Sequence, residues 1–476
     1  MLDRKSTDKR VLWNLSTMLK RHILYPVLML LLITVAGADE GWQAGVAKQN
    51  ITPDGAMWMA GYGSRDRPSE GKLTDLWAKA LVIQDASDNQ AVLITLDLVG
   101  IDRELAMAIT DQIQSVHQLD RSQIAICCSH THTGPALKRN LAPLHYLIVD
   151  AEQQKKIQAY EKRLRHQILA AVDDAFAQRQ PAELSWGSGT ATFATNRREN
   201  RPEGNVPQWR REGTLKGPVD HDVPVLAVRD RQGKLISVVF GYACHATVLG
   251  VYSWSGDYPG FACAALEASH PDSIALFWAG CGADQNPLPR RTVELAKHYG
   301  RRLATAVETV LMTIQMQPLS PKLNSNFREI DLPLGALPSR QQIEANSRSK
   351  NKWEAARATM LLERLDRGET LAQTYPYAVG SWTLGDDIDM VFLGGEVVVD
   401  YALRLKSELR GQQSWIAGYA NDVMAYIPSR RVLQEGGYEG GTSMVYYGLP
   451  AHWSPEVERH IVDEVHRQLA ESTRRE

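Results

Sequence analysis

The chain has 476 residues, of which 44% are hydrophobic and 23% are charged, and its formal net charge is −2. This composition supplies enough apolar surface for a large core and excludes a chain that is disordered throughout. The near-zero net charge argues against a nucleic-acid-binding protein, which would carry a basic stripe. Five cysteines are too few for a disulfide scaffold.

The first 38 residues have the pattern of a secretory signal. Six basic residues stand against two acidic residues over positions 1–22, and an uncharged, mostly apolar run follows over 23–38. This run ends in Ala36-Gly37-Ala38, a small-x-small cleavage pattern, and it is shorter than the roughly 20 residues that a spanning helix needs. We expect cleavage near Ala38 and an exported chain, periplasmic or secreted. The alternatives are an uncleaved signal anchor and a start at Met18.

Strand-like and helical segments then alternate along the chain. The expected strands cover 77–85, 91–98, 124–128, 274–280, 389–395 and 413–420, and two further strands at 223–230 and 235–243 form a hairpin. The expected helices cover 102–119, 151–178, 290–314, 338–367, 396–410 and 455–473. A long ordered loop is expected at 190–221. This order predicts one mixed α/β domain over 39–476, with layered β-sheets flanked by α-helices.

Several apolar strands run directly into polar residues. The polar groups are His130 and His132 after 124–128, His245 after 235–243, the run from Asp284 to Asn286 after 274–280, Glu396 after 389–395, and Asn421 and Tyr426 after 413–420. Ligands of open α/β sheets bind beyond the carboxyl ends of the strands. We therefore expect the active site at the C-terminal ends of these strands.

The residue types at these strand ends suit a metal ion. His130 and His132 are two apart, so in an extended segment both rings would face one side, and neutral imidazole suits zinc. Each residue alone has an ordinary explanation: a hydrogen-bonded turn for the histidine pair, a core position for His245, a turn for Asp284, and the first turn of a helix for Glu396. Their coincidence at strand ends favours a shared metal site.

The sequence lacks the motifs that would indicate other kinds of active site. The sequence contains no G-x-S-x-G elbow, no H-E-x-x-H pair and no G-x-x-x-x-G-K-[ST] loop. It contains no C-x-x-C pair, which argues against a structural zinc cluster. Cys127, Cys128, Cys244 and Cys281 stand beside the expected site, where we interpret them as small buried hydrophobic residues.

A series of motifs spans most of 44–450. It comprises AGVAKQNITP at 44–53, MAGYGSR at 59–65, SHTHTGP at 129–135, TNRRENRP at 195–202, ACHAT at 243–247, SGDYPG at 255–260, LGGEV at 393–397 and NDVMAYIPSRRVLQEGGYEGG at 421–441. In this order the motifs resemble the neutral/alkaline (non-lysosomal) ceramidase family. The ordered series is much more specific than any one of its members.

The resemblance implies a catalytic Zn²⁺ that serves hydrolysis of the N-acyl amide bond of ceramide. The implied metal ligands are His130, His245, Glu396 and Tyr426. The implied catalytic residues are His132, Arg197 and Tyr438, any of which would stabilise the developing oxyanion, together with Asp284 and Gln285 of the neighbouring loop.

Two features differ from the family pattern. Where ceramidases read G-D/N-x-S-P-N, this chain reads GADQNP at 282–287, with Gln285 in the place of the serine. Ceramidases also carry a β-sandwich domain after the catalytic one, and this chain ends soon after its last expected helix.

The expected function is exported, zinc-dependent hydrolysis of an N-acyl amide in a small molecule or lipid, with peripheral contact to a membrane surface. One alternative is a hydrolase of the same fold that acts on a different small amide or ester. The other is a non-catalytic, metal-containing protein that binds lipid or sugar.

Overall fold

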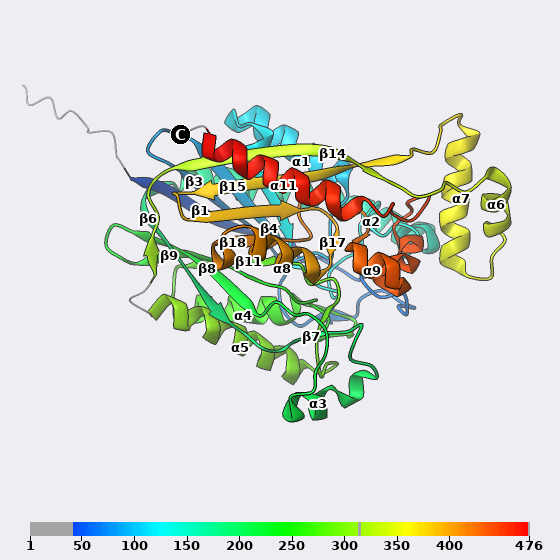
Figure 1. Cartoon of the computed structure of the whole chain (residues 1–476), viewed down its shortest axis with the longest axis horizontal. Helices are drawn as coiled ribbons and strands as arrows, with labels where there is room; N and C mark the ends of the chain where they lie inside the picture. The colour runs from blue at the N-terminus through cyan, green and yellow to red at the C-terminus, as the bar shows by residue number, and fades with distance from the viewer. Residues whose placement is uncertain (1–40, 313–315, 475–476) are drawn as a thin grey trace, which may run out of the picture. The chain divides into compact units, whose positions relative to one another are not determined.

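Two β-sheets form the centre of the computed structural model, which describes residues 41–312 and 316–474 (Figure 1). The expected signal segment, residues 1–38, lies outside the described residues. The nine-stranded sheet has the order β11 (Ile274–Ala279), β9 (Leu235–Tyr242), β8 (Asp222–Asp230), β6 (Gln180–Thr190), β1 (Trp42–Asn50), β3 (Trp77–Gln84), β4 (Gln90–Leu96) and β5 (Ile124–Cys128), with β13 (Gln317–Pro318) also paired to β6. The four-stranded sheet has the order β14 (Leu323–Pro333), β15 (Thr374–Leu384), β16 (Ile388–Leu393) and β18 (Ser414–Ala417).

The two sheets pack against each other through alternate side chains. In β4, Val92 and Ile94 face a core formed with the helices, whereas Leu93 faces the four-stranded sheet and shares a core with Trp382 and Phe392. Successive side chains of a strand point to opposite faces, so each strand of the larger sheet contributes to both cores. The helices on its outer face are α1 (Arg103–His117), α2 (Ala151–Ala177), α4 (Asp257–Ser269) and α5 (Val293–Met312).

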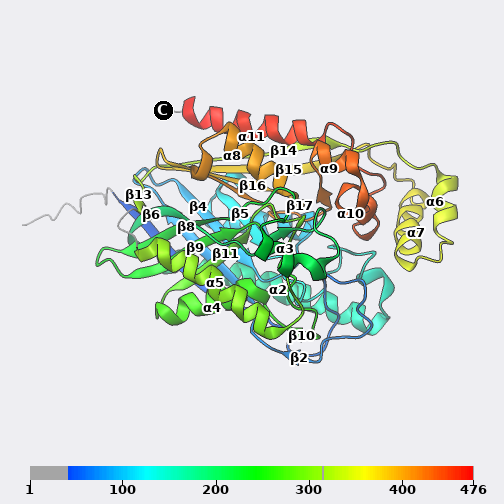
Figure 2. The same cartoon turned by 60° about the horizontal axis from the view of Figure 1, so that its bottom comes forward.

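The outer face of the four-stranded sheet is also covered by helices. Val391 and Leu393 of β16 share a core with Tyr401 of α8 (Val399–Glu408) and Val465 of α11 (Val457–Arg474). Figure 2 shows α8 and α11 on one side of the sheets and α4 and α5 on the other. The fold is therefore a mixed α/β arrangement of four layers, helices–sheet–sheet–helices, which confirms the predicted fold class.

Smaller elements complete the chain. They are the paired strands β2 (Gly71–Lys72) and β10 (Ser253–Trp254), β7 (Ala194–Asn196) and β12 (Gln285–Pro287), and β17 (Glu396–Val397) and β19 (Tyr426–Ile427), with the helices α3 (Val206–Glu212), α6 (Arg340–Asn346), α7 (Lys352–Asp366), α9 (Arg430–Glu435) and α10 (Gly437–Gly440). Within the described ranges, no helix is long and apolar enough to span a membrane. All five cysteines are free and buried, which confirms the interpretation of Cys127, Cys128, Cys244 and Cys281 as small buried hydrophobic residues.

Every strand predicted from the sequence is present, but two helix predictions need correction. The predicted helix 338–367 is two helices, because Asn351 caps α7 by accepting hydrogen bonds from the backbone of Trp353 and Glu354. The second correction concerns Glu396, which was expected to open a helix. It lies in β17 instead, where its N–H donates to the carbonyl of Ala425, and α8 begins only at Val399.

Some elements carry weak sequence signals. The edge strand β14 is largely polar and half-exposed, so no apolar run marks it. The segment 190–221, expected to be a loop, contains β7 and the short helix α3.

The ends of four strands meet beside one another. Ala417, the last residue of β18, bridges Gly280, which follows β11, and beyond β18 Ala420 forms a bridge with Cys127 of β5. The adjacent Asn421 also accepts a hydrogen bond from the backbone of Ile126 in β5. Because β9 is paired in parallel with β11, and β16 in parallel with β18, these contacts bring the segments after β5, β9, β16 and β18 into one region.

Candidate metal centre

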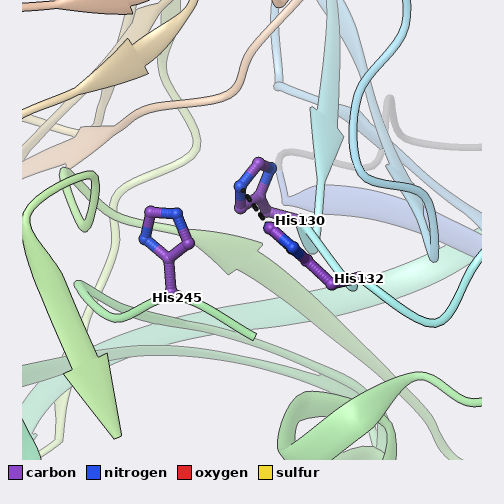
Figure 3. Close-up of side chains that lie close together, drawn as sticks. All are labelled: His130, His132 and His245. Atoms are coloured by element: carbon purple, nitrogen blue, oxygen red, sulfur yellow. Dashed lines mark hydrogen bonds between the residues drawn. The ribbon is translucent and has the colours of Figure 1, made fainter. Parts of the chain in front are cut away.

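Three histidine side chains converge in this region (Figure 3). His130, His132 and His245 are all buried, and each offers a ring nitrogen that lies within 4.8 Å of the other two. The Nε2 atoms of His130 and His132 are 3.1 Å apart. The cluster therefore joins the segment after β5 to the segment after β9.

The backbone conformation at His130 explains how two histidines of one short segment meet. β5 ends at Cys128, and His130 has a left-handed φ of 59°, so the segment is turned and the expected extended conformation is wrong. Residues other than glycine rarely adopt a positive φ, and this backbone conformation persists only where the surrounding structure holds it. Here the N–H of His132 donates to the carbonyl of Ala246 at 3.2 Å, which ties the two histidine-bearing loops together.

Hydrogen bonds to backbone carbonyls orient two of the three rings. His130 Nδ1 lies 2.5 Å from the carbonyl oxygen of Val99, and His245 Nδ1 lies 2.8 Å from that of Gly282. A carbonyl oxygen can only accept, so both Nδ1 atoms carry the proton. Each Nε2 then presents a lone pair to the interior, the arrangement in which imidazole binds a metal ion.

Glu396 completes a set of electron-rich atoms. Its Oε2 lies 3.2 Å from Nε2 of His130 and 3.2 Å from Nε2 of His245, and its Oε1 accepts a short hydrogen bond from the hydroxyl of Tyr447. Burial and the nearby charge of Arg197 lower the pKa of His245 to about 4.

These atoms fit a divalent cation. Oε2 of Glu396 has no hydrogen-bond donor among the described residues, and the facing Nε2 atoms of His130 and His245 carry lone pairs. Oε2 of Glu396 lies 3.2 Å from each of these two Nε2 atoms, and such electron-rich atoms repel unless a positive charge lies between them. Two imidazoles and a carboxylate are an ordinary ligand set for zinc.

Tyr426 and Arg197 border the same space. The hydroxyl of Tyr426 lies 3.4 Å from Nε2 of His245, and Arg197 donates to that hydroxyl at 3.1 Å. Arg197 also lies 3.5 Å from His245 Nε2 and forms a 2.7 Å ion pair with the buried Glu439. All four expected ligand residues thus meet at one place, with a fixed guanidinium beside them.

His132 differs from the other two histidines. Its Nδ1 is buried and has no hydrogen-bond partner among the described residues, whereas its Nε2 faces Nε2 of His130. Burial, followed by the neighbouring histidines, lowers the pKa of His132 well below its usual value, so the ring is neutral. Its single proton is best placed on Nε2, where it can be donated to the lone pair of His130. This geometry makes His132 a hydrogen-bond donor into the centre.

The remaining predicted residues lie around the centre. Tyr438 of α10 is 39% exposed and its ring packs on Tyr426 at a centroid distance of 5.2 Å. Asp284 accepts hydrogen bonds from the backbone of Val399 and from Asn196, so it holds loops together and does not face the imidazoles.

The structure does not bring the side chain of Gln285 to the histidine cluster. Its Nε2 donates to the carbonyl of Pro218 at 3.3 Å, because Gln285 lies in β12 and pairs with Asn196 of β7. The following residue, Asn286, approaches the centre instead: its Oδ1 lies 3.4 Å from a terminal nitrogen of Arg197.

Sequence reasoning missed three residues of the site. Tyr447 bonds Glu396, Glu439 pairs with Arg197, and the ring of Tyr419 lies 4.2 Å from that of His130 between centroids. Glu439 lies inside the GYEGG motif and could have been found there. Tyr447 and Tyr419 stand among other apolar and aromatic residues and carry no local signal.

The sequence of the chain is similar to those of known ceramidases. The model of the N-terminal part of neutral/alkaline non-lysosomal ceramidases matches residues 42–278. The chain is 26% identical over 225 residues to neutral ceramidase of Pseudomonas aeruginosa, a match that covers 46% of this chain and 32% of that protein. It is 24% identical over 233 residues to neutral ceramidase B of Dictyostelium discoideum, covering 48% of this chain and 32% of that protein. The match thus spans about a third of the length of these relatives.

Solved structures share the fold over most of the chain. The crystal structure of neutral ceramidase from Pseudomonas aeruginosa has a TM-score of 0.69 and 19% identity, covering 91% of this chain and 75% of that one. A structure described as ceramidase complexed with C2 has a TM-score of 0.69 and 17% identity, covering 91% of this chain and 76% of that one. The family match over 42–278, the similar neutral ceramidases and the ordered motifs place the chain in the neutral/alkaline non-lysosomal ceramidase family.

Proposed function

We propose that this protein is a zinc-dependent hydrolase that cleaves the N-acyl amide bond of a ceramide-type substrate. The observation that carries the proposal is the meeting of three ligand-type atoms, Nε2 of His130, Nε2 of His245 and Oε2 of Glu396, where the Nδ1 atoms of both rings face backbone carbonyl oxygens. The names of the similar proteins support the substrate class, because both are neutral ceramidases.

Four side chains of the site are suited to hold a zinc ion that takes part in the reaction. His130, His245 and Glu396 would hold the ion, with the hydroxyl of Tyr426 as a fourth ligand. When bound, such an ion activates a water molecule for attack and polarises the carbonyl of the scissile amide. Tyr447 keeps the carboxylate of Glu396 oriented through its hydrogen bond.

Two fixed donors face the place where negative charge develops. His132 directs its Nε2 proton toward the centre, and Arg197 is held beside Tyr426 and His245 by Glu439. Donors that are fixed before the reaction stabilise the oxyanion formed from the amide carbonyl, and losing one such donor typically lowers kcat by about 10² to 10³. We assign this role to His132 and Arg197.

Zinc analysis and a substrate panel test the proposal together. Purified protein is analysed for metals and assayed on ceramide, on short N-acyl amino acids and on the matching esters. We expect about one zinc per chain, hydrolysis of at least one amide, and loss of both zinc and activity in Glu396→Gln. Glu435→Gln is the matched control, since Glu435 is a partly exposed carboxylate that pairs with Arg198 away from the histidines. Zinc-loaded protein that cleaves no amide or ester would refute the proposed function.

Export is a separate part of the proposal. It rests on the basic region, the apolar run and the small residues that end at Ala38. Intact-mass analysis of protein from the periplasm or medium should give a chain that begins close to Asp39. Full-length chain found only in the membrane fraction would instead indicate a signal anchor.

A further inference from the structure

We propose that Arg65 is a positioning residue that holds His132 in its donor orientation, acting together with Gly61 and Tyr62. These residues belong to the segment 59–65, which follows β1 and packs against the loop that carries His132. The inference rests on the donor role proposed above for His132. The inference identifies the segment 59–65 as the part of the chain that orients the ring of His132 for that role.

His132 needs an external support because its own ring makes no orienting hydrogen bond to the backbone. The rings of His130 and His245 are each oriented by a carbonyl oxygen bonded to Nδ1. Nδ1 of His132 has no such partner in the described part of the chain. A buried ring without this bond keeps its orientation only through the atoms packed around it.

Gly61 and Tyr62 supply that packing. Gly61 has φ of +93°, and a Cβ atom at this position would lie 2.5 Å from Cγ and 2.6 Å from Nδ1 of His132. The glycine backbone therefore lies directly against the Nδ1 side of the ring, where a side chain would not fit. The ring of Tyr62 packs on His132 with a centroid distance of 4.8 Å and an interplanar angle of 56°.

Arg65 joins this segment to the backbone of His132. One terminal nitrogen donates to the carbonyl of His132 at 2.7 Å, and the other donates to the carbonyl of Val251 at 3.2 Å. The Nε of Arg65 donates to the carbonyl of Ala60 at 3.3 Å. A single side chain thus links three backbone segments, and one of them is the peptide group of His132 itself.

The cost of burying Arg65 argues that it has a role. The residue is 4% exposed, and no carboxylate pairs with it among the residues that the structure describes. Burial lowers the pKa of its guanidinium to about 10, so the group stays charged near neutral pH. A buried charge without a counter-ion costs several kcal/mol. The rings of Tyr62 and Tyr252 offset part of that cost, with centroids 5.4 and 5.1 Å from the guanidinium carbon.

A hydrogen bond to His145 also holds the segment 59–65 in place. The N–H of Gly61 donates to Nε2 of His145 at 3.0 Å. Burial lowers the pKa of His145 to about 3, so its ring is neutral and can accept this bond. Gly61 is thereby pinned between His145 on one side and the ring of His132 on the other.

The test compares Arg65→Met with the matched control Arg121→Met. Arg121 is half-buried, donates to a backbone carbonyl, that of Ile124, and packs its guanidinium 4.0 Å from the ring centroid of Phe327. Burial lowers the pKa of Arg121 to about 10, as it does for Arg65. Arg121 stands at the start of β5, and His130 follows the other end of that strand.

The kinetic arm uses a double-mutant cycle with His132→Ala. We expect Arg65→Met to lower kcat roughly 10- to 100-fold with little change in KM or zinc content, because small misplacements of a catalytic group are that costly. On the His132→Ala background, Arg65→Met should have almost no further effect on kcat. Arg121→Met should lower Tm to a similar degree and leave kcat unchanged. A full additional loss on the His132→Ala background would overturn the proposal, and so would an unchanged kcat in Arg65→Met.

The structural arm does not depend on turnover. In crystal structures of the zinc-loaded protein, Arg65→Met should show the His132 ring displaced or in two rotamers, whereas Arg121→Met should show one ordered ring. If the wild type cleaves no amide, the proposed function fails, but an unmoved His132 ring in Arg65→Met would still refute the positioning role separately. Should Arg65→Met fail to fold, Arg65→Lys replaces it, since one ammonium group cannot reach all three carbonyl oxygens. It should show the same ring displacement to a smaller degree, and an undisturbed ring would refute the proposal.

Discussion

Nε of Arg197 lies 2.7 Å from Oε1 of Glu439, and this ion pair is buried beside the histidine cluster. Glu439 is 2% exposed and pairs through its second oxygen with Arg198, also at 2.7 Å. Desolvation works against the guanidinium of Arg197, but Tyr426 and Glu439 outweigh it and raise its pKa well above the usual value. The carboxylate therefore keeps a charged donor in place next to Tyr426.

Glu439→Gln should damage both stability and catalysis. Removing one partner of a buried ion pair leaves the other charge uncompensated, so we expect the free energy of unfolding to fall by about 3–5 kcal/mol. We also expect kcat/KM on the preferred amide to fall by about 10². Urea denaturation and steady-state kinetics measure the two effects. The control Glu435→Gln weakens two partly exposed contacts, with Arg198 and Arg431, and should change stability by at most about 1 kcal/mol. Equal effects of both variants would contradict this prediction.

His245→Ala should lose most of the bound zinc. The imidazole of His245 is oriented by Gly282 and faces Glu396, so its removal takes away one ligand and leaves the carboxylate without that neighbour. Elemental analysis after dialysis gives the metal content. The control His270→Ala removes a histidine that pairs with Glu308 between α4 and α5, and should retain zinc. Equal zinc in wild type and His245→Ala would show that the ligand assignment is wrong.

Gln285→Ser should not improve hydrolysis of ceramide. The Gln285 side chain donates to Pro218 and does not face the histidines, so a hydroxyl at that position would not reach the substrate. Asn286→Ala removes a contact of Arg197 and should lower kcat/KM roughly tenfold, as expected for a hydrogen bond to a charged group. The measurement is kcat/KM on ceramide and on short N-acyl substrates. A gain of more than tenfold on ceramide in Gln285→Ser would show instead that position 285 contacts the substrate.

Asp422 should make the protein less stable as the pH rises toward neutrality. Burial raises the pKa of this carboxyl to about 7, although its Oδ2 accepts a hydrogen bond from Tyr375 at 2.6 Å. Since the folded-state pKa lies above the ordinary value of 3.8 for an aspartate, the stabilising contribution is complete below about pH 4 and is lost as the pH rises to about 7.

Asp422→Asn tests this pH dependence. Compared with wild type, the variant should gain stability progressively between pH 4 and 7, by up to about 4 kcal/mol, since each unit of pKa shift corresponds to about 1.4 kcal/mol. Urea unfolding at several pH values gives the difference. Asp272→Asn, which alters a carboxylate whose side chain is 78% exposed, should give a difference that does not change over this range. A flat difference for Asp422→Asn as well would contradict the prediction.

Much of the fold and part of the site follow from local sequence patterns. The apolar runs of β3, β4, β8 and β9 are present as predicted, because strands buried on both faces are almost continuously apolar and adjacent residues show this directly. Polar residues after apolar strands also identified His130, His245 and Glu396, since strands that share a sheet edge bring their ends together. The sequence by itself thus determined the layers and the region of the centre.

Tertiary structure alone decided which side chains face one another there. Pairing of β17 with β19 made Glu396 part of a strand, and pairing of β12 with β7 turned Gln285 toward Pro218 and Asn286 toward Arg197. The roles of Tyr447 and Arg65 likewise depend on contacts with segments far away in the chain. Periodicity and residue type report only on a residue and its close neighbours, whereas these orientations arise when distant segments pack and their backbones compete for the same hydrogen bonds.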